Sequence, residues 1–298
     1  MDNRAEVREF LTSRRAQVRP EDVGLPPGPK RRVPGLRRGE VAMLANVSVE
    51  YYTRLERGAI GGASPEVLDA LAKALRLDEA ERAHLFDLAQ AAGPVARPPR
   101  RRASNPWTPH RSLQWALDAV TAGPAFVRNG RMDLLAANPL ARAFYKDVYD
   151  MPGEVPNLAR FTMLDPRARD FHPDWEAAAD VVAQILRTEA ARDPRNKELH
   201  DLVGELCTRS EDFASRWSAH DVRHHGTGFK TFRHPVVGEL TLAYEGLEMA
   251  AEPGLTLTVY SAEPGSASEE ALRLLASWWA SERGDRANEA AERPRTQT

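Results

Sequence analysis

The sequence predicts an all-α N-terminal domain of five helices, followed by an α+β domain with an antiparallel sheet of about five strands. Before residue 93, apolar residues recur at helical spacing, whereas several segments after residue 120 alternate between apolar and polar residues. All six tryptophans and 17 of the 21 aromatic residues lie after residue 106, so the second half carries a large core of its own. At 298 residues the chain is long enough for two domains.

The five N-terminal helices are expected near residues 4–18, 38–45, 48–56, 65–75 and 79–92. Ser64 followed by Pro65 is a helix start, and Asp78 with Glu81 has the spacing of a capping box. Prolines and arginines without acidic residues then indicate a linker rather than a core. We therefore predict a first domain at 1–92, a linker at 93–110, a second domain at 111–280, and a disordered tail at 281–298.

The strand patterns of the second domain fall into two groups. Asn129-Gly130 separates residues 125–128 from 132–137 and predicts a hairpin. Alternation is clear in residues 239–247 and 255–260, and helices are expected between the two groups, near 173–191 and 194–220. This arrangement is typical of an α+β domain.

Charge is divided unequally along the chain. Residues 1–102 hold 19 basic and 14 acidic side chains, a net charge of +5, which leaves a net charge of −7 on the remainder. A basic module joined to an acidic one is typical of a nucleic-acid-binding domain attached to a second domain. The single cysteine, Cys207, excludes an internal disulfide, and no signal peptide or membrane-spanning run is present. We expect a cytoplasmic protein with no membrane partner.

Residues 37–58 predict two short helices joined by a tight turn at Asn46, with Ser48 capping the second helix. Asparagine tolerates the left-handed backbone that such a turn requires, and Tyr52 and Leu55 have the spacing to face inward. The opposite face would enter a major groove. A plain helical bundle is the competing interpretation, but turn, cap and exposed basic residues together favour a helix-turn-helix. A nearby basic run would contact the DNA backbone or the minor groove. The candidate DNA-binding residues, with this run included, are Arg38, Ser48, Val49, Glu50, Tyr51, Arg54, Lys30, Arg31 and Arg32.

Residues 1–92 resemble the Cro/CI-type (xenobiotic-response-element-like) helix-turn-helix family, whose partner is double-stranded DNA. The resemblance implies phosphate contacts by Arg38 and Ser48, base contacts from the second helix, and a buried pair between Arg15 and Glu56. Two departures are Asn46 in place of the usual glycine and a longer basic loop at 20–36. A homodimer is expected, because one module contacts few base pairs and relatives use two half-sites.

Several sequence segments of the second half resemble actinobacterial regulators with an MmyB-like ligand-binding domain. Among them are Leu-Asp-Pro-Arg-Ala-Arg at 164–169 and Ser-Glu-Asp-Phe-Ala-Ser-Arg-Trp at 210–217. The resemblance extends over residues 107–277. It implies a PAS-like fold that encloses a pocket for a small apolar molecule such as a fatty acid. Met132 and Ala137 stand where relatives commonly carry tryptophan, which leaves room for a larger cavity.

Aromatic residues are the candidates for lining this pocket, although for any one of them a plain core role is the competing interpretation: Trp115, Phe126, Phe144, Phe161, Trp175, Phe213, Trp217 and Phe229. The candidates for holding a polar head group at its mouth are Arg128, Asn138 and His234. The pocket is expected to be mostly apolar, with a volume of about 300–1,000 Å³.

Histidines cluster between His220 and His234, but their spacing across an expected helix end does not make a metal site. No phosphate-binding loop, nucleophile elbow or paired-carboxylate motif stands out. We expect no metal, no cofactor and no enzyme activity. The leading hypothesis is a DNA-binding regulator that senses a small apolar ligand. The alternatives are a regulator whose second domain serves only dimerisation or protein docking, and a DNA-binding enzyme.

Overall fold

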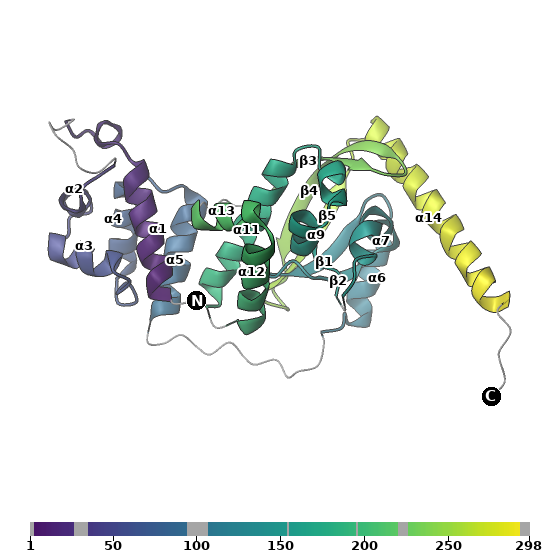
Figure 1. The fold of residues 1–298 in the computed structure, drawn as a ribbon, viewed down its shortest axis with the longest axis horizontal. Coiled ribbons are helices and arrows are strands. Elements are labelled where there is room, and N and C mark those ends of the chain that lie inside the picture. Colours follow the sequence, from purple (N-terminus) through teal and green to yellow (C-terminus); the bar gives the residue numbers. More distant parts are fainter. Residues whose placement is uncertain are drawn as a thin grey trace. The chain divides into compact units, whose positions relative to one another are not determined.

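The computed structural model describes residues 3–26, 35–93, 107–153, 155–194, 196–219 and 226–292, with side chains described as far as residue 283 (Figure 1). The chain forms two compact units. The first contains the described residues of Met1–Ala103 and Asp180–His224, and the second contains those of Ser104–Ala179 and His225–Thr298.

The first unit begins with the five helices that the sequence predicts. They are α1 (Asn3–Gln17), α2 (Arg38–Leu44), α3 (Val49–Glu56), α4 (Pro65–Ala74) and α5 (Glu79–Ala92), with a short 3-10 turn at Pro20–Val23. Both expected caps are present: the Ser64 hydroxyl accepts from the Val67 N–H at 3.4 Å, and Asp78 and Glu81 exchange hydrogen bonds. Their apolar faces meet in one fully buried core that includes Phe10, Leu36, Tyr52, Leu71 and Leu85.

Three later helices pack in the same unit: most of α11 (Trp175–Arg192), α12 (Lys197–Arg209) and α13 (Glu211–Ala219). The buried guanidinium of Arg187 on α11 forms an ion pair with the buried Glu6 carboxylate of α1. From the sequence, these helices are expected in the second domain, and residues 194–220 are expected to form one helix. Instead, Ser210 adopts an extended backbone that ends α12, and its hydroxyl accepts from the Phe213 N–H at 3.1 Å at the start of α13.

The second unit is an antiparallel sheet with helices, which confirms the predicted α+β class. The strands are β1 (Ala125–Asn129), β2 (Leu134–Ala137), β3 (Thr227–His234), β4 (Gly238–Glu248) and β5 (Leu255–Ser261), in the order β2-β1-β5-β4-β3. The helices are α6 (Arg111–Ala119), α7 (Pro139–Phe144), α8 (Lys146–Tyr149), α9 (Leu158–Leu164), α10 (Arg167–Phe171) and α14 (Ala267–Glu292).

The two faces of the sheet differ in what they pack against. On one face, aliphatic residues of β1 and β5, such as Val127 and Leu257, pack with α6. The other face carries an aromatic cluster in which Phe144 of α7 contacts Phe232 of β3 and Phe171 of α10, with ring centroids 5.0 Å and 5.4 Å apart. This aromatic face is the main core of the second unit.

One sequence expectation about a strand boundary is wrong. The second hairpin strand begins at Leu134 rather than 132, because the Asn129 side chain accepts from the backbone N–H groups of Arg131 and Asp133 and widens the turn. The helix α14 continues to Glu292, and the disordered tail expected at 281–298 stays a prediction. The residues of α14 after Ser281 are small or charged and cannot form a core of their own. Alanine, glutamate and arginine nevertheless favour a helix, and the first turns of α14 are anchored by buried Leu272 and Leu275.

Candidate functional site

The turn between α2 and α3 has the geometry that the sequence predicts. Asn46 adopts a positive φ of 53°, and the Ser48 hydroxyl accepts from the Tyr51 N–H at 3.0 Å to cap α3. Tyr52 and Leu55 face the core with 0% and 1% exposure, as expected from their spacing. The opposite face of α3 is consequently directed outward.

A single buried carboxylate ties the first three helices together. Glu56, at the end of α3, accepts from the Nε of Arg15 on α1 at 2.6 Å and from the Nε of Arg38 on α2. The Tyr52 hydroxyl also donates to Glu56, at 3.2 Å. Burial acts to raise the pKa of Glu56, but the hydrogen bonds from the two arginines outweigh it and hold the pKa below its ordinary value. The orientation of α3 therefore depends on this cluster.

The outward face of α3 presents the residues predicted to contact bases. Val49 is 45% exposed, and Glu50 and Arg54 are also exposed. The guanidinium carbon of Arg54 lies 5.0 Å from the ring centroid of Tyr51, a cation–π contact on the outward side of α3. Arg38 is tied to Glu56, but about half of its side chain is exposed. Lys30, Arg31 and Arg32 lie outside the described residues.

A tight turn, a capped second helix and an exposed polar face on a rigid buried support define a helix-turn-helix DNA-binding domain. Comparison with protein families agrees, because residues 6–85 match the family described as a helix-turn-helix domain. Residues 109–275 match the family described as the MmyB-like transcription regulator ligand binding domain, over more than half of the chain. The chain belongs to the MmyB-like transcription regulators, and it combines a DNA-binding domain with a domain for a small-molecule effector. No curated protein matches the chain significantly.

The ligand-binding match includes α11, α12 and α13, which pack in the same compact unit as the DNA-binding helices. Two of the predicted pocket aromatics, Phe213 and Trp217, lie on α13 and stack on each other with ring centroids 5.6 Å apart. The guanidinium of Arg187 lies 4.3 Å from the Trp217 ring centroid. These two aromatics therefore belong to a different packing environment from the aromatic face of the sheet.

The other predicted aromatics divide into buried and exposed groups. Phe126, Phe144 and Phe161 are nearly fully buried on the aromatic face, and Trp175 is buried with its indole N–H donating to the Thr162 carbonyl at 2.9 Å. A final pair, Trp115 on α6 and Phe229 on β3, is 68% and 75% exposed, respectively. The structure brings the first three together, and it leaves the last pair on the surface.

Two of the three side chains proposed to hold a ligand's head group form hydrogen bonds with backbone groups instead. The Asn138 amide makes four hydrogen bonds at the start of α7, to the N–H groups of Ala125 and Ala141 and to the carbonyls of Val120 and Gly123. The buried His234 ring donates from Nε2 to the Ala143 carbonyl at 3.3 Å, and its Nδ1 accepts from the Val236 N–H at 3.2 Å. Both side chains stabilise the fold around α7.

Arg128, the third of these residues, shares the aromatic face with a lysine that the sequence analysis did not single out. Lys230 is half-buried, with its Nζ 4.5 Å from the Tyr244 ring centroid, and burial together with the charge of Arg128 lowers its pKa to about 8. The buried Tyr145 hydroxyl donates to the Tyr260 hydroxyl at 3.2 Å. The aromatic face therefore combines positive charge with hydroxyl groups in an otherwise apolar setting.

Lys230 was missed because β3 was not identified as a strand. Its period-two relation to Phe232 and His234, both buried, is the signal that would have placed it on the inward face. Among the described residues, no group of three or more potential ligands is arranged to hold a metal ion. In the same part of the chain, no helix is both long and apolar enough to cross a membrane.

Proposed function

We propose that the chain acts as a homodimer that recognises double-stranded DNA through the outward face of α3, and that a fatty acid or similar amphipathic carboxylate changes its affinity for that DNA. The observation that carries the DNA-binding proposal is the exposed face of α3 on its buried support at Glu56. Arg54 would donate to a guanine edge, and Glu50 would accept from a cytosine amino group.

Binding-site selection with three variants tests this assignment. We expect Arg54→Ala to cost about 1–3 kcal/mol of binding free energy and to relax sequence preference at one position. Arg38→Ala should weaken binding to all sequences and reduce the salt slope by about one. Arg8→Ala is the matched control, because Arg8 is exposed on α1 and its loss removes the same charge without touching α3. If Arg54→Ala kept both affinity and preference, α3 would not be the recognition helix.

The positive charge on the aromatic face supports a carboxylate effector. Burying a cation in apolar surroundings is costly, and a bound carboxylate would offset that cost while its alkyl chain contacted aromatic rings. Lys230 and Arg128 are the side chains we assign to the head group.

Titration with saturated fatty acids, while the affinity for the selected DNA is measured, tests the effector. We expect a saturating ligand to change that affinity and Lys230→Met to weaken ligand binding. Arg233→Met is the matched control, because Arg233 is exposed on the alternate face of the same strand. An unchanged DNA affinity with demonstrably bound fatty acid would contradict the proposal.

Exposed aromatic side chains favour one alternative, in which the second domain docks a protein or a second copy without any small molecule. Trp115 and Phe229 are large apolar groups that a monomer leaves in water. Native mass spectrometry of freshly purified protein separates the two possibilities. A co-purified ligand supports the sensor, whereas a dimer without one, together with no response to fatty acids, supports docking.

A further inference from the structure

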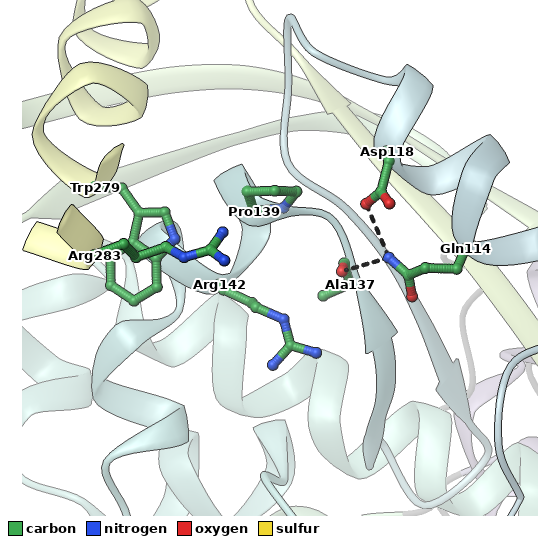
Figure 2. A pocket seen from close by; sticks show the side chains of 7 residues that line it. All are labelled: Gln114, Asp118, Ala137, Pro139, Arg142, Trp279 and Arg283. Carbon is green, nitrogen blue, oxygen red and sulfur yellow. Dashed lines mark hydrogen bonds between the residues drawn. The ribbon is translucent and has the colours of Figure 1, made fainter. Parts of the chain in front are cut away.

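A hollow of about 410 Å³ lies in the second unit, at the edge of the sheet where β2 ends (Figure 2). Its walls come from the end of β2 and from three helices, with Gln114 on α6, Arg142 on α7, and Trp279 and Arg283 on α14. The volume falls within the range of small-molecule sites, about 300–1,000 Å³. Ala137, where relatives commonly carry tryptophan, also lines the hollow.

The hollow carries positive charge at one end. Figure 2 shows the side chains of Arg142 and Arg283 lining the hollow from two different helices. Among the described residues, neither guanidinium forms an ion pair, although Arg142 also contacts the Tyr149 ring at 5.2 Å from its centroid. Two like charges that line one hollow without an ion-pair partner repel each other, and a bound anion would offset that cost.

The acidic residue of the hollow lies at its other end. Asp118 accepts from the Gln114 side-chain N–H at 2.9 Å, and the same Gln114 nitrogen donates to the Ala137 carbonyl at 3.4 Å. In Figure 2 these groups lie across the hollow from the two arginines. The hollow is therefore positive at the end formed by α7 and α14 and negative at the end formed by α6, so an anion would bind at the first end.

A second, independent observation is the indole of Trp279. Its Nε1 is buried and has no hydrogen-bond acceptor among the described residues. A buried donor without an acceptor is costly and uncommon in folded proteins, so it calls for a bound group. The ring also supplies a flat apolar wall, which suits a planar ligand body.

We propose that this hollow is a binding site for a small organic anion, a carboxylate or phosphate ester attached to a flat apolar group. The anionic oxygens accept from Arg142, Arg283 and the Trp279 indole, and the apolar body lies against the Trp279 ring. A guanidinium presents paired N–H donors that match carboxylate and phosphate oxygens, which is why two arginines fit this chemistry. The site is distinct from the fatty-acid site proposed above and does not depend on it.

The test is ligand titration followed by the indole ¹⁵N–H resonances of the full-length chain, with Trp279→Phe identifying the relevant signal. The probes are benzoate, phenyl phosphate and the uncharged benzyl alcohol, all at millimolar concentration. We expect benzoate or phenyl phosphate to shift the Trp279 signal and benzyl alcohol to leave it in place. The comparison of the two anions shows whether a carboxylate or a phosphate is preferred.

Charge variants complete the test. Arg142→Gln and Arg283→Gln should each raise the Kd of the better anion about tenfold or more, because each removes a charged donor. Arg273→Gln is the matched control, since Arg273 is also on α14 but pairs with Glu269 at 2.7 Å and does not line the hollow. The proposal is overturned if neither anion shifts the signal, if benzyl alcohol shifts it equally, or if both glutamine variants bind like the wild type.

Discussion

Replacing Glu56 with alanine should release α1 and α2 from the recognition helix. The carboxylate is 1% exposed, and its loss leaves the Arg15 side chain, 11% exposed, without its acidic partner. The Tyr52 hydroxyl loses its acceptor as well. Arg38 is half exposed and regains water, so its share of the loss is small. Breaking a buried ion pair typically costs about 3–5 kcal/mol, which corresponds to a local opening roughly a thousandfold more frequent.

Amide hydrogen exchange of peptides from α1, α2 and α3, in the full-length chain, measures this local stability directly. We expect much faster exchange in Glu56→Ala. The double variant Arg15→Met with Glu56→Leu should recover part of the protection, because an apolar pair of similar size often replaces a buried ion pair at little cost. Glu79→Ala is the control, since Glu79 is an exposed carboxylate on α5. An increase in exchange below about tenfold in Glu56→Ala would refute this account of the cluster.

The remaining predictions concern a glycine, the half-buried Lys230 and a second ion pair. Gly58→Ala should destabilise the first unit by more than about 2 kcal/mol, because the φ angle of Gly58 is +97° and the added Cβ would lie 2.7 Å from the α1 backbone. Gly62→Ala is the control and should not destabilise the unit, because the space around Gly62 is open. Thermal unfolding compares the two. The affinity for a fatty acid, measured by calorimetry, should fall as pH rises through about 8, because the Lys230 ammonium then loses its proton, and Lys230→Met should remove that dependence. Finally, Glu6→Ala should cost about 3–5 kcal/mol by leaving the Arg187 guanidinium buried without an acid, and hydrogen exchange in α1 and α11 reports it.

Local signals predicted the DNA-binding half well. The five helices, the left-handed turn at Asn46 and the cap at Ser48 each depend on residues within a few positions of one another, so spacing and residue type suffice. The inward position of Tyr52 follows from the same periodicity. The family resemblance added the buried pair of Arg15 and Glu56, which no local pattern predicts because 41 positions separate the two residues.

The sequence by itself therefore determined the fold class, the helix-turn-helix and the family. The tertiary structure decided what depends on distant residues meeting. It placed α11 to α13 beside the DNA-binding helices, and it used Asn138 and His234 for backbone contacts. It also brought Arg142 and Arg283, more than a hundred positions apart, into one hollow. The physical reason is that periodicity and capping report only a residue's own helix or strand, whereas a binding site depends on which elements pack together and which side chains remain unpaired there.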